Sequence, residues 1–314
     1  MIGFQSKDIT LVLMKLAAID IGSNAVRLQI TRVLEYEKVI TFKKLEYVRF
    51  PLRLGHDVFS TGSISEYNEA RFFKLMTAYK NLIDLYEIDA YYGCATSAMR
   101  ESENGQEIVD RVHDELGIDI EIISGDEEAE MINKVILQGL DNGHYIHIDV
   151  GGGSTELNIY ENHKKVHSHS FKIGSVRTLE GGDTLEAWQE MKEWVGTVAF
   201  KSSGKIEAVG TGGNINKLFE LSGSNLKSKK MSLETLMKTQ DVLKNLTLED
   251  RLNKLQLNPD RADVIIPASD IYVGVMQAAK AKKIIVPDVG LKDGINYHMY
   301  QTHFPDSDKV FVKN

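Results

Sequence analysis

Alternating apolar and polar positions occur twice in this chain in the same order. The segment KLAAIDIGSNAVRLQI at 15–30 has a strand pattern, an aspartate, a glycine-containing turn and a second strand pattern, and HYIHIDVGGGSTELNIY at 144–160 repeats that order. Alternation with period two is typical of strands that bury one face. The repeat predicts two similar domains, 1–137 and 138–314, that meet where QGLDNG at 138–143 breaks the pattern.

Helical periodicity fills the stretches between these strands. Apolar residues at helical spacing predict a helix over 64–88, with Phe72, Met76 and Tyr79 on its buried face. We expect a third strand over 37–50, then strands at 90–99 and 118–124 that alternate with helices at 103–118 and 125–140. This order predicts an α/β fold whose mixed sheets are flanked by helices. The remainder, 228–300, is predicted to be mainly helical with one strand near 283–288.

Composition restricts the classes of partner. The chain has 314 residues, of which 42% are hydrophobic and 26% charged, and its 37 basic against 45 acidic residues give a net charge of −8. Proteins that coat nucleic acid usually carry the opposite sign. Cys94 is the only cysteine, no apolar stretch is long enough for a membrane span, and the first 13 residues lack signal-peptide features. We therefore expect a cytoplasmic protein without a nucleic-acid or membrane partner, in which residues 1–13 are an extension.

The two turns carry the candidate chemistry. Three successive glycines exceed what a two-residue hairpin turn requires, although a plain hairpin turn stays the alternative. Strands follow both turns, which excludes the Walker and Rossmann loops, because those loops lead into a helix. Backbone N–H groups of a hairpin turn can still bind phosphate oxygens. The hydroxyl and amide side chains that would add donors are those of Ser23, Asn24, Ser154 and Thr155.

Acidic residues next to both turns suggest a cation. Asp20, Asp149 and Glu156 would repel phosphate unless a metal ion lay between them, and Mg²⁺ is the hard cation that shares carboxylate, water and phosphate ligands. Taken singly, each acid is equally well explained as a turn or cap residue. Their combination with the glycine turns predicts a magnesium–phosphate site.

Other polar residues leave alternatives open. Arg100, at the end of the strand predicted at 90–99, is a candidate for a bidentate phosphate contact or for a surface salt bridge. Glu127 and Glu128 begin a helix, where the helix dipole alone explains two acids, so these residues by themselves select neither as a base. The histidines between 144 and 169 have no partner at zinc spacing, and solvated strand edges explain them.

These motifs together resemble the exopolyphosphatase/guanosine pentaphosphate phosphohydrolase family. The matching segments are DIGSNAVRL, CATSAMRESEN, ISGDEEAEM, IDVGGGSTEL, KIGSVRTLEG, VGTGGNINKL, RADVIIPAS and PDVGLKDG, in family order over residues 14–300. The resemblance implies two ribonuclease-H-like domains of the actin-like ATPase superfamily around a cleft, with a C-terminal helix near 291–304 that packs back on the first domain. It implies Mg²⁺-dependent release of a terminal phosphate from inorganic polyphosphate, from pppGpp or from both.

The resemblance also assigns roles to residues. It implies Glu127 as the base that activates water and Asp20, Asp149 and Glu156 as metal-binding acids. The implied phosphate contacts come from both turns, from Arg100 and from a third loop: Gly22, Ser23, Asn24, Arg100, Gly151, Gly152, Gly153, Ser154, Thr155, Gly212, Gly213 and Asn214.

Long family members have a C-terminal HD-type helical region, and we expect none in this protein. We therefore expect short polyphosphate or a guanosine polyphosphate as the ligand, and keep a homodimer open. Two other hypotheses stand beside the hydrolase: a guanosine-nucleotide sensor without turnover, and a sugar or acetate kinase. We also expect the domains to close over the ligand by hinging near 137–144.

Overall fold

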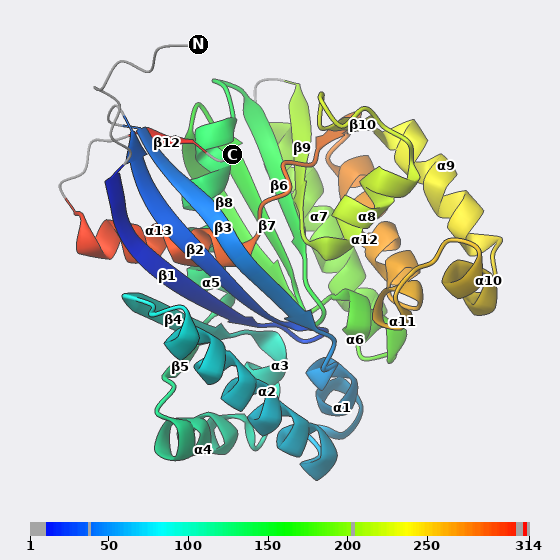
Figure 1. The fold of residues 1–314 in the computed structure, drawn as a ribbon. Coiled ribbons are helices and arrows are strands. Elements are labelled where there is room, and N and C mark those ends of the chain that lie inside the picture. The colour runs from blue at the N-terminus through cyan, green and yellow to red at the C-terminus, as the bar shows by residue number, and fades with distance from the viewer. Residues whose placement is uncertain (1–10, 37–38, 202–204, 306–309, 313–314) are drawn as a thin grey trace.

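Two six-stranded sheets, each with its own helices, form two lobes (Figure 1). The computed structural model describes residues 11–36, 39–201, 205–305 and 310–312. The first sheet has the order β12-β3-β2-β1-β4-β5. Its strands are β1 (Leu11–Ile21), β2 (Val26–Tyr36), β3 (Val39–Phe50), β4 (Ala90–Ala95), β5 (Ile120–Ile122) and β12 (Val310–Val312).

The second sheet repeats this arrangement in the order β10-β11-β9-β6-β7-β8. Its strands are β6 (His144–Val150), β7 (Thr155–Glu161), β8 (Lys164–Phe171), β9 (Ile206–Thr211), β10 (Lys230–Ser232) and β11 (Lys283–Ile285). In both sheets three consecutive antiparallel strands are followed by two strands parallel to the first of them. The predicted class, α/β with mixed sheets flanked by helices, is confirmed.

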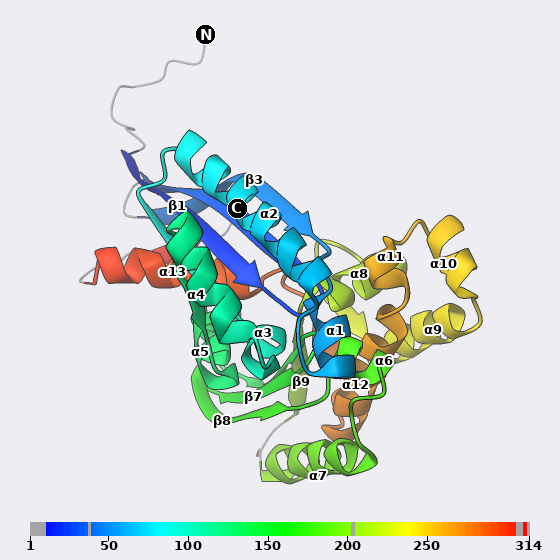
Figure 2. The same cartoon turned by 90° about the horizontal axis from the view of Figure 1, so that it is seen from below.

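Helices of the first lobe cover one face of its sheet, and the first of them also packs against the second lobe (Figure 2). They are α1 (Leu54–Thr61), α2 (Glu66–Leu85), α3 (Ser97–Glu101) and α4 (Gly105–Leu116). Helix α2 starts where the Ser65 side chain accepts a hydrogen bond from the Asn68 N–H, and it buries Phe72, Met76 and Tyr79 as its periodicity predicts.

Arg100 lies in helix α3, whereas the sequence pattern predicts it at the end of a strand. Strand β4 pairs with β1 only as far as Ala95, which lies opposite Ile21. Beyond Ile21 the first strand enters its glycine turn, so the chain after Ala95 has no neighbouring strand to continue the ladder. It instead turns into a short helix that begins at Ser97.

Helices of the second lobe bury a larger core against one face of its sheet. They are α6 (Ser175–Leu179), α7 (Leu185–Lys201), α8 (Gly213–Leu221), α9 (Leu233–Lys244), α10 (Leu248–Asn253), α11 (Pro259–Ala262) and α12 (Ile265–Ala278). The mainly helical region predicted at 228–300 is present. Helix α12 is its central member and is buried along most of its length.

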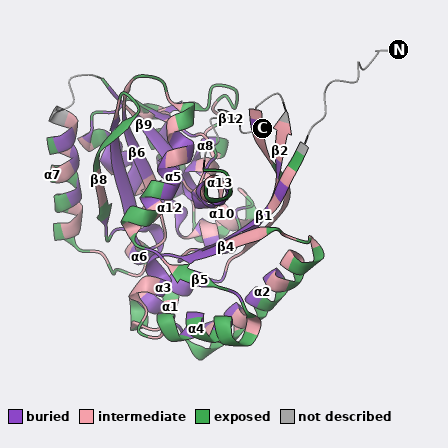
Figure 3. Cartoon of the chain, turned by 90° about the vertical axis from the view of Figure 1, so that its left-hand side faces the viewer, coloured by how far each residue is buried: buried purple, intermediate pink, exposed green. Residues whose placement is uncertain are grey.

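Two helices lie between the sheets and join the lobes (Figure 3). Helices α5 (Gly125–Ile136) and α13 (Leu291–His303) pack on each other and on strands of both sheets, with the short 3-10 turn η1 (Leu137–Gly139) after α5. They cross closely at Gly294, where a Cβ would stand 2.5 Å from the Met131 carbonyl oxygen. This shared core fixes one side of the lobe junction and leaves a cleft on the other.

Candidate active site

A cleft of about 580 Å³ lies between the lobes and receives both predicted glycine turns. Residues of β1–β3, of the turns after β6 and β9, and of the start of α13 line it. Among the residues predicted from the sequence, those that line it are Asp20, Gly22, Ser23, Asn24, Asp149, Gly151, Gly152, Ser154, Gly212, Gly213 and Asn214.

The two glycine turns are built alike. Asp20 lies opposite Arg27 across the β1–β2 pair, and Asp149 lies opposite Glu156 across the β6–β7 pair. Each turn is closed by one backbone bond between equivalent positions, from the Gly22 N–H to Ala25 and from the Gly151 N–H to Ser154. The duplicated unit therefore presents an acid and a base in one lobe and two acids in the other.

The second turn directs its carbonyl groups away from the cleft. The Gly151 and Gly152 oxygens accept hydrogen bonds from the first N–H groups of α6, and the Gly153 oxygen accepts one from the Arg177 guanidinium at 2.7 Å. These peptides are trans, so the N–H of each points opposite to its carbonyl. The N–H groups of Gly152, Gly153 and Ser154 consequently point away from α6, which is the arrangement that an anion-binding turn requires.

The turns of the two lobes touch. A Cβ built on Gly152 would lie 2.7 Å from the Ser23 Cβ and 3.4 Å from the Asn24 nitrogen. The Ser23 hydroxyl is buried and lies 2.8 Å from the Ser97 hydroxyl at the start of α3. One ligand can therefore contact both turns at once.

Four carboxyl groups influence one another at this junction. Burial, opposed by a hydrogen bond from Thr211, raises the pKa of Asp149 to about 6. Burial and the neighbouring acids also raise the pKa values of Glu156 and of Glu128, which lies in the first turn of α5. The Asp20 carboxylate lies 3.0 Å from the Arg27 guanidinium and pairs with it. The cluster thus has more negative charge than the surrounding protein neutralises.

This donor set fits a hard cation, though not one held by protein ligands alone. Within the described part of the chain, no three His, Cys, Asp or Glu side chains are grouped closely enough to hold a metal ion. Glu156 is already occupied, since its Oε1 accepts hydrogen bonds from Ser154 at 2.6 Å and Ser170 at 2.9 Å. Mg²⁺ commonly binds through one or two carboxylates and completes its shell with water and phosphate oxygens. Asp149, with Asp20 and Glu128 on the same cleft wall, suits that mode.

Basic residues also line the cleft, and a β-bulge arranges part of this set. Between Ile30 and Thr31 the β2–β3 register shifts, so that Leu45 is an extra residue on β3. Lys44 lies opposite Thr31, and Arg49 lies opposite Arg27. Without the bulge, alternation would place Leu45, not Lys44, on the face that carries Arg49. We call the set Arg27, Lys43, Lys44, Arg49, Arg261 and Lys292 the basic wall.

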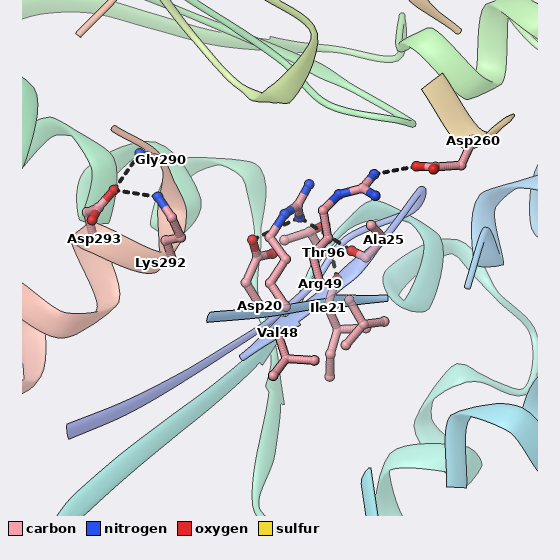
Figure 4. Close-up of polar contacts among 12 residues, drawn as sticks. Asp20, Ile21, Ala25, Val48, Arg49, Thr96, Asp260, Gly290, Lys292 and Asp293 are labelled. Atoms are coloured by element: carbon pink, nitrogen blue, oxygen red, sulfur yellow. Dashed lines mark hydrogen bonds and ion pairs between the residues drawn. The ribbon is translucent and has the colours of Figure 1, made fainter. Parts of the chain in front are cut away.

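Carboxylates hold several of these cations in place (Figure 4). Arg49 pairs with Asp260 at the start of α11, and the Asn24 side-chain amide donates to the Asp260 carbonyl at 2.8 Å. Lys292 pairs with Asp293 at 2.7 Å, and Asp293 also accepts the Gly290 N–H at 3.0 Å. The basic wall is therefore assembled from both lobes and from the segment that leads into α13.

Five predicted site residues do not line the cleft. Glu127 is exposed, and its carboxylate accepts the Ser124 N–H at 2.8 Å in a capping box, whereas its neighbour Glu128 lines the cleft. The other four lie behind the surface: Gly153, Thr155 and Glu156 in or after the second turn, and Arg100.

Each of the four has another partner. The Thr155 hydroxyl donates to the Ile173 carbonyl at 2.6 Å, and Arg100 donates to the Ile123 carbonyl. Arg100 still acts on the site electrostatically, because its charge lowers the pKa values of Glu128 and Glu156. Nine of the twelve residues predicted to contact phosphate thus line the cleft, and Glu127 does not.

Sequence reasoning missed the basic wall. Arg27 had a detectable signal, since it stands at the position in the first turn that Glu156 occupies in the second. Lys44 had none, because its face depends on the bulge. Arg261 and Lys292 come from segments more than 200 residues away along the chain, which only the folded structure brings near.

Comparison with known proteins agrees with these features. The profile of the Ppx/GppA phosphatase family matches residues 33–303. The chain belongs to this family. A Ppx/GppA family member from Aquifex aeolicus has the same fold, with a TM-score of 0.73 and 25% identity over 92% of this chain and 98% of that one. An exopolyphosphatase structure from Cytophaga hutchinsonii shares the fold with a TM-score of 0.80 at 22% identity, covering 92% of this chain and 98% of that one.

Curated relatives are longer than this family member. A guanosine-5'-triphosphate,3'-diphosphate pyrophosphatase of Vibrio cholerae is 25% identical over 303 residues, which are 91% of this chain and 59% of that protein. A bifunctional 3-dehydroquinate synthase/phosphatase of Fusobacterium nucleatum is 38% identical over 173 residues, 52% of this chain and 26% of that protein. The chain thus spans between about a quarter and three fifths of the length of these relatives.

No described helix is long and apolar enough to cross a membrane.

Proposed function

We propose that this phosphatase-family protein hydrolyses the terminal phosphoanhydride bond of short inorganic polyphosphate or of pppGpp, with Mg²⁺ as cofactor. The observation that carries the proposal is the presence, in one cleft, of a carboxylate cluster and the basic wall. Hydrolysis of a chain of phosphoryl groups needs both sets of residues. Basic side chains bind the phosphates along the chain, and carboxylates at the scissile bond bind the metal ion and accept a proton.

The terminal phosphoryl group would lie between the two glycine turns. The N–H groups of Gly152 and Ser154 would donate to its oxygens, and Ser23 would approach from the other lobe. Asp149 and Asp20 would hold the cation, which neutralises phosphate charge and polarises the scissile bond. Lys44, Arg49, Arg261 and Lys292 would bind the remaining phosphates.

Glu128 would act as the base. It lines the cleft with Asp149, and burial together with the neighbouring acids raises its pKa, which makes its ionised form a stronger proton acceptor. The water oxygen would form the new bond to phosphorus while Glu128 accepts a water proton. The bridging oxygen would leave with the shortened phosphate chain.

A phosphate-release assay tests this proposal. The intact chain with Mg²⁺ is expected to release phosphate from tripolyphosphate or pppGpp, and chelation with EDTA is expected to abolish the release. A comparison with long polyphosphate tells whether chain length is discriminated. Absence of release from all three substrates, with retained pppGpp binding, would favour the alternative of a guanosine-nucleotide sensor without turnover.

A further inference from the structure

A row of buried polar side chains lies directly behind Asp149. Across β6, β7 and β8 the residues His147, Asn158 and Ser168 are cross-strand neighbours, one step along the sheet from Asp149, Glu156 and Ser170. His147 and Asn158 are both 0% exposed. Polar groups in a sheet interior destabilise the fold unless they are hydrogen-bonded, so this row requires an account.

The row is connected to Asp149 through Thr211 at the end of β9. Ser168 donates to the Asn158 oxygen at 2.8 Å, the Asn158 nitrogen lies 3.2 Å from His147 Nδ1, and His147 Nε2 lies 2.8 Å from the Thr211 hydroxyl. Thr211 lies opposite Asp149 in the β6–β9 pair, and its side chain is a hydrogen-bond partner that lowers the pKa of the Asp149 carboxylate against the larger effect of burial.

The donor and acceptor capacities of these groups determine which atom donates in each hydrogen bond. An ionised carboxylate only accepts, so the Thr211 hydroxyl must donate its single proton to Asp149. The hydroxyl oxygen is then an acceptor for His147, whose Nε2 must carry the ring proton. The Asn158 amide nitrogen can only donate, so His147 Nδ1 accepts from it, and the imidazole is the tautomer that carries its proton on Nε2.

We propose that His147 and Thr211 form a positioning relay that holds the Asp149 carboxylate in the orientation in which it binds the divalent cation. The inference rests on the proposed function, since it assigns Asp149 to the cation. Neither His147 nor Thr211 lines the cleft, so both act through Asp149 rather than on the substrate. Partners of this kind, which contact a ligand residue and not the metal, commonly affect metal affinity strongly.

The relay uses features that differ between the two turns. Asp20, the equivalent of Asp149, receives the Arg27 guanidinium across its strand pair. Asp149 receives a hydroxyl instead and faces the acid Glu156. Only Asp149 is thus oriented by a neutral donor that leaves its negative charge available to a cation.

Three variants of the full chain separate positioning from packing. Thr211→Val removes the donor to Asp149 at similar size, and His147→Leu removes the donor to Thr211. His147→Gln keeps a side-chain N–H near the position of the imidazole Nε2 and serves as the conservative rescue. For each we would measure Mn²⁺ binding by the loss of the free-ion electron paramagnetic resonance signal, then the Mg²⁺ dependence of phosphate release from tripolyphosphate, and the melting temperature in EDTA.

We expect Thr211→Val and His147→Leu to weaken Mn²⁺ binding about tenfold or more. Tenfold is the lower end of the loss in metal affinity that follows removal of a residue hydrogen-bonded to a metal ligand. The Mg²⁺ concentration for half-maximal release should rise by the same factor, and His147→Gln should recover most of the loss. Mn²⁺ affinities within twofold of wild type for Thr211→Val and His147→Leu, with lowered melting temperatures, would show a packing role and overturn the inference. If His147→Leu does not fold, Thr211→Val decides alone.

The wild-type chain distinguishes this inference from the proposed function. If the wild-type protein binds Mn²⁺ and releases phosphate, and the variants bind Mn²⁺ as tightly as wild type, only the relay is overturned. Wild-type protein that does neither overturns the proposed function and the relay with it.

Discussion

Glu127 and Glu128 are adjacent in the chain, yet their carboxyl groups serve different parts of the molecule. The Glu127 carboxylate turns back to the Ser124 N–H and hydroxyl, both at 2.8 Å, and completes the helix cap. The Glu128 side chain lines the cleft with Asp149 and Asp20. A helix turns by about 100° per residue, so two neighbouring acids cannot both face the same site.

The pair Glu128→Gln and Glu127→Gln tests which acid is the base. We expect Glu128→Gln to slow phosphate release roughly 10²-fold or more, the usual contribution of a general base, while pppGpp still binds. Glu127→Gln should keep activity within about twofold and change stability little, because glutamine at this position also closes a capping box. Phosphate-release rates and denaturant unfolding of both variants would check this, and the reverse activity pattern would restore Glu127 as the base.

The sequence predicted the duplicated fold well because its signals are local. Both hairpins have strict alternation on either side of a glycine turn, and α2 shows one apolar face. The site was less predictable where it depends on direction. The spacing of Ser124 and Glu127 is a capping-box signature that marks Glu127 as the acid of the cap, and sequence reasoning overlooked it. The Leu45 bulge that turns Lys44 toward the cleft leaves no mark in the hydrophobic pattern.

The contact between the turns predicts that Gly152 tolerates no side chain. In Gly152→Ala the new Cβ would meet Ser23 at 2.7 Å and force the two turns apart. Since catalysis is sensitive to displacements of about 1 Å, we expect phosphate release to fall on the order of 10²-fold. Gly196→Ala in α7 is the matched control, because no atom lies within 4 Å of its added Cβ and alanine stabilises a helix. Equal activity of both variants would show that the turns need not touch.

The basic wall predicts a selective effect of Lys44. Lys44→Met removes a cation from the β2–β3 face without touching the carboxylate cluster, so KM for tripolyphosphate should rise about tenfold while kcat changes little. The effect should shrink in high salt because exposed charges are screened. Lys74→Met, an exposed position on α2, is the control and should match wild type in steady-state assays at both salt concentrations. A fall in kcat at unchanged KM would instead place Lys44 near the breaking bond.

Without bound metal, ionisation of Asp149 should lower the free energy of unfolding as the pH rises. Its folded-state pKa of about 6 exceeds its ordinary 3.8, so the folded protein binds this proton more tightly than the unfolded chain does. The resulting stabilisation is complete below pH 3.8 and is lost as the pH rises through 6. A pKa difference of about two corresponds to about 3 kcal/mol.

In EDTA at pH 8, Asp149→Asn should therefore unfold at higher urea concentration than wild type, and at pH 4 the two should nearly coincide. Mg²⁺ should restore the wild-type protein at pH 8 and leave Asp149→Asn unchanged, because a cation stabilises only the ionised carboxylate. A stability difference that is the same at both pH values would mean that Asp149 is not the buried charge that the cation neutralises.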